Sequence, residues 1–135
     1  MQELTLNATV ENIEKVTAFV DEQLEALSCP MKAQMQIDIA IDELFGNIAN
    51  YAYNPDVGIA TVKVEVVENP MAVVITFIDN GMPYDPLSRK DPDTTLSAEE
   101  REIGGLGIYL VKKSMDEISY EYKDGKNILR IKKNL

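Results

Sequence analysis

A carboxylate and a carboxamide stand four residues apart in an otherwise apolar stretch, at Glu43 and Asn47. Residues at this spacing share one face of a helix, so both side chains are predicted to project from the same place. Polar groups inside an apolar helix need partners. They either cap a neighbouring loop or bond to each other, or they do chemistry. In the chemical interpretation, Asn47 gives an oxygen to Mg²⁺ and Glu43 acts as a general base.

A second candidate follows a run, Met71 to Ile78, that is apolar on both faces and predicts a central strand. The run ends in Asp79-Asn80-Gly81. A carboxylate here would accept a hydrogen bond from an exocyclic amine, while Gly81 would let the backbone approach a ligand closely. The same three residues are typical of a tight turn. The sequence leaves both interpretations open.

A third candidate is a glycine-rich stretch, in which Gly104, Gly105 and Gly107 precede an apolar run that begins at Ile108. Glycines leave the first N–H groups of a following helix uncovered, and these groups bind anions such as phosphate. A glycine-rich turn into a core helix explains the same residues. The Rossmann fingerprint does not fit, since Leu110 stands where a third glycine is required. The Walker ending, Gly-Lys-Ser/Thr, is absent.

The first half of the chain predicts one strand and two helices. Gln2 to Leu6 alternates and predicts an edge strand, and an amphipathic helix begins at Thr9. A second helix is predicted from about Met31 to Tyr53, because Pro30 suits a first helical turn. Its apolar residues cover more than one face, so we expect it to be well buried.

The second half predicts the rest of a sheet. Ile59 to Val67 alternates and predicts a strand with one wet face, in an antiparallel pair with the central strand. After the glycine-rich stretch, a helix is predicted to about Met115. A C-terminal β-hairpin then turns at Asp124-Gly125 and returns over Ile128 to Lys132.

Residues 82–102 show neither strand nor helix periodicity and contain three prolines. A structureless segment of that length inside a compact domain is typical either of a functional lid or of disorder. If a nucleotide binds to the chain, we expect a lid here to be mobile without it and to order on binding. A short helical turn is expected within it, because Ser97 to Glu100 has the pattern of a capping box.

Composition narrows the class of protein. At 135 residues the chain is expected to form a single domain, 1–135. A net charge of −10 argues against nucleic-acid binding, and no apolar run is long enough for a membrane helix. The lack of histidine excludes serine triads and most zinc sites. Cys29, the single cysteine, cannot form an internal disulfide, so a cytoplasmic location is expected.

The order of the three motifs resembles the GHKL ATPase superfamily. The resemblance covers nearly the whole chain: Glu43-Leu-Phe-Gly-Asn47, a strand ending Asp79-Asn-Gly81, a lid, and Gly104-Gly-Leu-Gly107 opening a helix. Within the superfamily the chain is similar to the anti-sigma-factor serine/threonine kinase branch. The stretches that carry this second resemblance are Ile39–Tyr53, Asp79–Pro86, Gly104–Val111 and Met115–Glu117.

The resemblance implies an α+β two-layer sandwich, in which helices cover one face of a mostly antiparallel mixed sheet. ATP or ADP would bind between the helices and the lid. Asn47 would coordinate Mg²⁺, and Glu43 would be the catalytic base. Asp79 would hold the adenine amino group, with Gly81 beside the base. The phosphate-binding residues would be Arg101, Gly104, Gly105, Leu106 and Gly107.

The resemblance also implies an activity. The chain would phosphorylate a small anti-sigma-factor antagonist on serine or threonine and would sequester a sigma factor, as a homodimer. Two alternatives stay open: an ATP-binding adaptor or anti-sigma module with little turnover, and a detached histidine-kinase catalytic domain. The short lid favours the serine kinase over the last of these.

Overall fold

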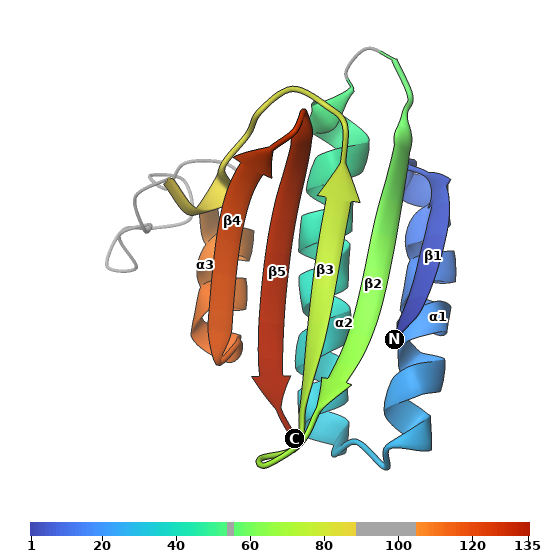
Figure 1. Ribbon diagram of the computed structural model, residues 1–135, viewed down its shortest axis with the longest axis vertical. Coiled ribbons are helices and arrows are strands. Elements are labelled where there is room, and N and C mark those ends of the chain that lie inside the picture. The colour runs from blue at the N-terminus through green and yellow to red at the C-terminus, as the bar shows by residue number, and fades with distance from the viewer. Residues whose placement is uncertain (54–55, 89–104) are drawn as a thin grey trace.

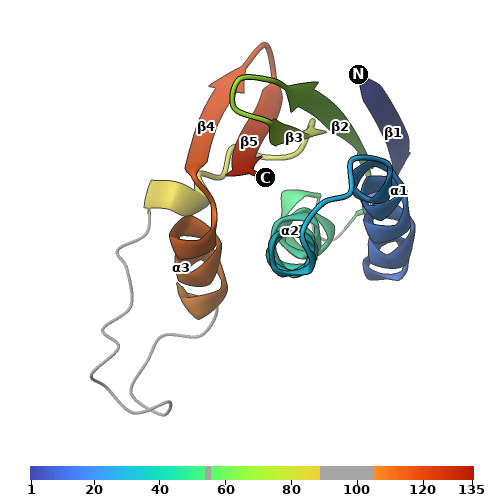
Figure 2. The same ribbon diagram turned by 90° about the horizontal axis from the view of Figure 1, so that it is seen from below.

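The computed structural model describes residues 1–53, 56–88 and 105–135. A five-stranded sheet in the order β1-β2-β3-β5-β4 carries helices on one face, and all of its neighbouring strands are antiparallel (Figures 1 and 2). The expected α+β two-layer sandwich is therefore confirmed. The strands and main helices are β1 (Gln2–Asn7), α1 (Ile13–Ala26), α2 (Met31–Asn47), β2 (Ile59–Val67), β3 (Ala72–Asp79), α3 (Gly105–Ser114), β4 (Glu117–Lys123) and β5 (Lys126–Asn134).

Every strand predicted from the sequence is present. β1 is an edge strand, β3 lies at the centre, and β4 and β5 form the C-terminal hairpin. The pairing of β5 with β3 brings the end of the chain into the middle of the sheet. In that register Asp79 on β3 lies opposite Asn127 on β5. Two polar residues far apart in the sequence therefore become neighbours.

The core lies between the helices and the sheet. Each helix contributes side chains at helical spacing, and each strand contributes alternate residues. Among the described residues, no helix has the length and apolar character needed to cross a membrane. The largest fully buried side chains are Val16, Val20, Leu24, Ile37, Ile41, Phe45, Val62, Val73, Ile75, Phe77, Val111 and Ile131.

Helix α2 is less buried than predicted. Met31, Met35 and Ile39 are 78%, 58% and 55% exposed. These residues form a stripe at four-residue spacing along the outer side of the helix. In a two-layer sandwich the sheet covers α2 on one side only, with α1 and α3 on either side of it (Figure 2). The prediction of a well-buried helix was therefore wrong for this outer face.

The end of α2 also differs from the prediction. The α-helix ends at Asn47 and continues as one π-helical turn, Ile48–Ala52. The hydroxyl of Tyr53, the next residue, donates to the carbonyl of Ile59 at 2.6 Å and accepts from the N–H of Asn80 at 2.7 Å. These bonds attach the end of the helix to β2 and to the turn after β3. π-Helical turns of this kind often occur at functional sites.

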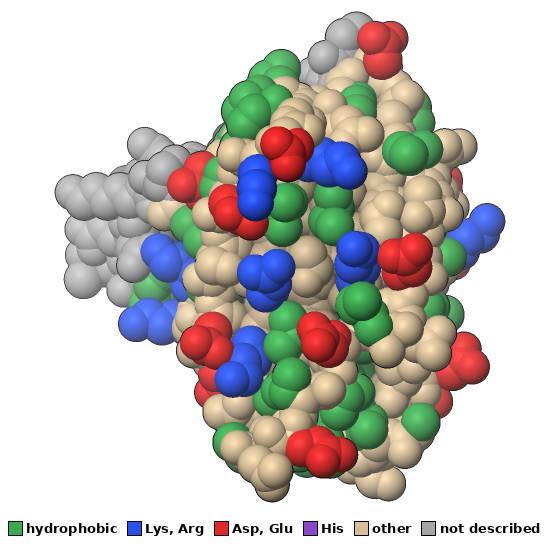
Figure 3. Space-filling view, viewed as in Figure 1, with side chains coloured by type: hydrophobic (Ala, Val, Ile, Leu, Met, Phe, Trp, Pro, Cys, Tyr) green, Lys and Arg blue, Asp and Glu red, His purple; other side chains and the backbone are tan. Residues whose placement is uncertain are grey.

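Among the described residues, no helix covers the opposite face of the sheet (Figures 1 and 3). Acidic and basic side chains are interspersed on it (Figure 3), and in the described part of the chain two ion pairs join neighbouring strands. Lys63 lies 4.0 Å from Glu3, and Lys132 lies 3.2 Å from Glu117. The wet face predicted for β2 is confirmed, although Val66, which alternation places on the same face as Val62 and Val64, is 40% exposed.

Candidate functional site

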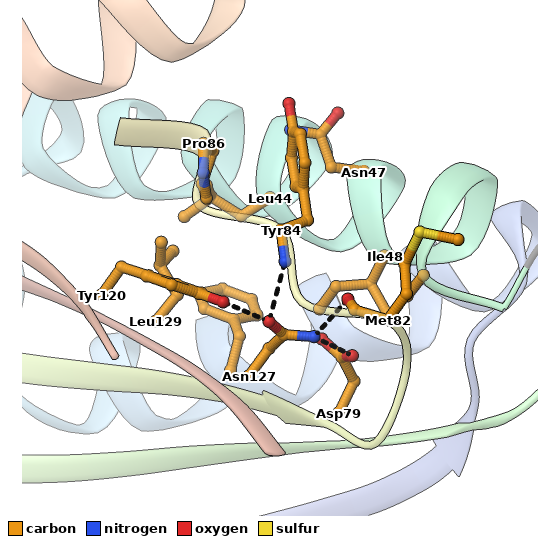
Figure 4. A pocket seen from close by; sticks show the side chains of 12 residues that line it. Leu44, Asn47, Ile48, Asp79, Met82, Tyr84, Pro86, Tyr120, Asn127 and Leu129 are labelled. Atoms are coloured by element: carbon orange, nitrogen blue, oxygen red, sulfur yellow. Dashed lines mark hydrogen bonds between the residues drawn. The ribbon is translucent and has the colours of Figure 1, made fainter. Parts of the chain in front are cut away.

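A cavity lies between the end of α2, the sheet and the segment that follows β3 (Figure 4). Its volume is about 40 Å³, room for roughly two or three water molecules. The wall is mostly apolar, and its residues are Leu44, Asn47, Ile48, Ala52, Phe77, Asp79, Met82, Tyr84, Pro86, Tyr120, Asn127 and Leu129.

Asp79 is the acidic residue of this cavity wall. It is the last residue of β3 and is only 5% exposed. Its Oδ1 accepts the N–H of Gly81 at 2.9 Å and the Nδ2 of Asn127 at 3.0 Å. The described part of the chain gives no hydrogen bond to Oδ2. Oδ1 of Asp79 therefore stabilises the backbone just after β3, as a structural role would require. The role of Asp79 in ligand binding remains a prediction.

Gly81 is required by a close approach of two backbones. A Cβ atom at this position would overlap the backbone carbonyl of Ala52 in the π-helical turn. The next N–H, of Met82, donates to that same carbonyl at 3.0 Å. Glycine therefore lets the chain after Asp79 pack against the end of the helix, and this contact places the rim of the cavity, Met82 to Pro86.

Asn127 is a site residue that the sequence analysis missed. It is 6% exposed and faces the cavity from β5. Its Oδ1 accepts from the N–H of Tyr84 at 3.1 Å and from the hydroxyl of Tyr120. A signal was present, since alternation puts residue 127 on the same face as Leu129 and Ile131. The return strand was predicted to begin at Ile128, so this polar residue at a core position went unnoticed.

Two exposed tyrosines lie close together near the cavity. The rings of Tyr51, in the π-helical turn, and Tyr84, in the rim, have centroids 6.5 Å apart and planes inclined at 43°. Edge and offset contacts of this kind are favourable between aromatic rings. The two rings therefore form an exposed aromatic pair beside the cavity.

Glu43 and Asn47 share one face of α2, as predicted. Burial raises the pKa of the Glu43 carboxyl, and its side-chain hydrogen bond with Asn47 acts in the opposite direction. Asn47 also lines the cavity. The two side chains therefore lie near each other, as the structural interpretation of the pair also requires. The assigned roles, a base for Glu43 and a metal ligand for Asn47, remain predictions.

The glycine-rich stretch meets this pair at the start of α3. Gly105 is the first residue of the helix, and Leu106 and Gly107 follow within it. A Cβ atom at Gly107 would overlap the carboxylate oxygens of Glu43, so the carboxylate lies directly against this glycine. Arg101, Gly104, the predicted capping box and most of the predicted lid lie outside the described residues.

The residues present fit an adenine nucleotide with Mg²⁺. Apolar walls with a carboxylate suit a flat ring that carries an amino group. The start of α3 and the Asn47 oxygen suit phosphates and a hard cation. Within residues 1–53, 56–88 and 105–135, no cluster of three or more histidine, cysteine or acidic side chains could hold a metal by itself. In the predicted role, Asn47 would give a magnesium ion one protein oxygen, beside the oxygens of the phosphates.

Comparison with known proteins agrees with this geometry. The serine/threonine-protein kinase BtrW of Bordetella bronchiseptica is 27% identical over 100 residues, which cover 74% of this chain and 70% of BtrW. The serine-protein kinase RsbW of Bacillus thuringiensis is 34% identical over 98 residues, covering 70% of this chain and 60% of RsbW. The model of the histidine kinase-like ATPase domain matches residues 6–133. The chain therefore belongs to the histidine kinase-like ATPase family.

Proposed function

We propose that this chain is an ATP-dependent serine/threonine protein kinase that acts as an anti-sigma factor. The observation that supports it most is the position of Glu43, a partly buried carboxylate that lies against Gly107 and near Asn47. A carboxylate of this kind, next to a helix N-terminus of the sort that binds phosphate, suits proton abstraction during phosphoryl transfer. The relatives BtrW and RsbW, which are named as protein kinases, support the same activity.

The base of ATP is recognised at the apolar end of the site. Asp79 accepts a hydrogen bond from the adenine amino group, and Gly81 lets the backbone pass beside the ring. The N–H groups at Gly105 and Gly107 are positioned for phosphate oxygens. Arg101, Gly104 and Leu106 are assigned to the phosphates by the family resemblance alone. Bound Mg²⁺, with Asn47 as a ligand, would neutralise phosphate charge.

Glu43 carries the proton in this proposal. Its carboxylate takes the proton of the substrate hydroxyl as the hydroxyl oxygen bonds to the γ-phosphorus. The bond from that phosphorus to the oxygen bridging the β- and γ-phosphates breaks, and ADP leaves. A raised pKa makes Glu43 a stronger base than an ordinary surface glutamate, which suits it to this step.

The protein substrate is proposed from the resemblance to the anti-sigma kinase branch. It is a small anti-sigma-factor antagonist, phosphorylated on serine or threonine, in competition with a sigma factor that the kinase sequesters. The same resemblance supports a cytoplasmic homodimer that regulates transcription by exchanging these two partners.

The test is a phosphotransfer assay with γ-labelled ATP, Mg²⁺ and a candidate antagonist protein. We expect label on a serine or threonine of the antagonist, located by mass spectrometry, with ADP formed in equal amount. ATP binding without turnover on any such partner would instead support an ATP-binding adaptor or anti-sigma module. Label on a histidine of a partner would support the detached histidine-kinase domain.

A further inference from the structure

An apolar ridge runs along the outer side of α2. Its residues, Met31, Met35 and Ile39, follow one another at four-residue spacing and are 78%, 58% and 55% exposed. The sheet covers the opposite side of α2, and α1 and α3 lie beside it (Figure 2). Single exposed apolar residues are normal on a protein surface, whereas a row of large ones is typical of an interaction site.

The α2 ridge leads toward the Glu43 carboxylate. Glu43 is the next residue at the same spacing, one helical turn after Ile39. One turn of an α-helix rises by only about 5.4 Å. A protein segment that lies on the ridge therefore has one end close to Glu43, where it can present a hydroxyl group to the carboxylate.

Acidic side chains border the α2 ridge on the side of α1. Asp21 of α1 and Asp38 of α2 lie near each other between the two helices, and the charge of Asp42 also acts on Asp38. Glu25, four residues after Asp21 on the same side of α1, is exposed. This border attracts a partner that carries lysine or arginine.

Charge also excludes a second copy of this chain as the occupant. Two copies packed through their α2 ridges would set the same acidic borders against each other. The shape of the ridge favours a helix, because a row of side chains at four-residue spacing packs into the groove between the rows of another helix. A helix with one apolar face and one basic edge would match both the ridge and its border.

We propose that the α2 ridge is the docking surface for the protein that the kinase phosphorylates, and that it binds a basic amphipathic helix of that protein. The apolar face of this helix lies on Met31, Met35 and Ile39, and its basic edge faces α1. The inference rests on the proposed kinase function and adds the place where the protein substrate binds.

The test measures phosphotransfer kinetics with the antagonist protein that accepts label from ATP. Met35→Lys puts a positive charge in the middle of the ridge, so the KM for the antagonist should rise at least ~10-fold, as for loss of a central interface contact. Met35 lies about two helical turns from Glu43, so kcat and the KM for ATP should stay the same.

Met35→Glu separates the charge of the partner from its apolar contact. Glutamate also removes the methionine, but it attracts a basic edge, so the KM for the antagonist should rise by only roughly 3-fold. Lysine and glutamate have similar helix propensities, so both variants should fold. Equal rises in KM for the two variants would overturn the basic character of the partner.

The matched control is Met71→Lys, which makes the same change at an exposed methionine in the turn between β2 and β3. Its KM for the antagonist should equal that of the wild type. If a folded Met35→Lys protein phosphorylates the antagonist with the wild-type KM, the docking surface is overturned and the kinase function stands.

A synthetic peptide tests the same surface without turnover. The peptide carries leucine and lysine at helical spacing, and a scrambled peptide of the same composition is its control. In NMR spectra of the isotope-labelled protein, the first peptide should shift the amide signals of Met31, Met35 and Ile39 more than the scrambled one does. Shifts at the ridge without phosphorylation of any antagonist would reject the kinase function and support the surface. Equal or absent shifts with both peptides would overturn the surface itself.

Discussion

Two carboxylates beside α2 differ in what surrounds them. Asp79 is fixed by a backbone N–H and by the Nδ2 of Asn127, both on one oxygen. Glu43 is partly buried, lies near the side chain of Asn47, and lies against the Cα of Gly107. A carboxylate with fixed donors suits recognition, because its acceptor role is set before the ligand arrives. One with a raised pKa and few partners suits proton transfer.

Glu43→Gln tests the proton-transfer side of this comparison and should have the largest effect. Glutamine keeps the shape of the side chain and loses the base, so phosphotransfer should fall by roughly 10²–10⁴-fold. Because burial raises the pKa of Glu43, activity should be lost on acidification at a higher pH than for an ordinary glutamate. Nucleotide affinity should stay the same.

The control for Glu43→Gln is Asp42→Asn, which removes one acidic charge from the neighbouring, exposed position. It should leave the rate of phosphotransfer unchanged. A full rate in Glu43→Gln would mean that Glu43 is a structural partner of Asn47 and not the base.

Gly107→Ala displaces Glu43 without changing its chemistry. The new Cβ atom would overlap the carboxylate oxygens, so Glu43 or the start of α3 must move. A shift of about 1 Å in a catalytic group reduces turnover by up to ~10²-fold. Gly46→Ala is the matched control, since its Cβ atom would meet only the Cδ1 of Ile13, at 3.9 Å. Equal phosphotransfer rates in the two variants would show that the contact with Gly107 is unimportant.

Asp79→Asn tests whether Asp79 recognises the adenine base. The amide presents donors where the carboxylate had only acceptors, so ADP affinity should fall by roughly 10- to 100-fold. Asp124→Asn, in the exposed turn between β4 and β5, makes the same change away from the cavity and should bind ADP normally. Unchanged ADP affinity in a folded Asp79→Asn protein, measured by calorimetry, would remove adenine recognition from this residue.

A pair of acidic side chains between α1 and α2 provides the smallest test, because it lacks the donors that surround Asp79. Asp21 on α1 and Asp38 on α2 each have a buried Oδ1 with no hydrogen-bond partner among the described residues. Burial, the neighbouring Asp21 carboxyl and the charge of Asp42 raise the pKa of Asp38 from 3.8 to about 7. A proton on Asp38 lets it donate to Asp21, so we expect the pair to hold one proton below this pH.

The folded protein therefore binds the Asp38 proton more tightly than the unfolded chain does. Stability from this group is fully present below pH 3.8 and is lost as pH rises through about 7. Asp38→Asn should raise the free energy of unfolding at pH 8 by about 1 kcal/mol, a value reduced for solvent screening of a partly exposed group. Urea unfolding at pH 4 should show no such gain. An equal gain at both pH values would exclude titration of Asp38 as the cause.

Much of the fold could be predicted from local patterns. Strand β2 was predicted from the alternation in residues 59–67, and β3 from the unbroken apolar run after Met71. The C-terminal hairpin was predicted from the turn at Asp124-Gly125. Residue types also indicated Glu43 and Asn47 as a pair, because their spacing puts them on one helical face whatever the tertiary structure. Local geometry alone determined these features, since each depends on residues within a few positions of one another.

The tertiary structure decided which of these elements meet. Strand β5 pairs with β3, and only that register sets Asn127 against Asp79. The contact between Glu43 and Gly107 depends on how α3 packs beside α2. The same packing left Met35 exposed, although its helical pattern indicated burial. Periodicity reports which face of an element is apolar, whereas the partner of each face is chosen by the packing of the whole chain.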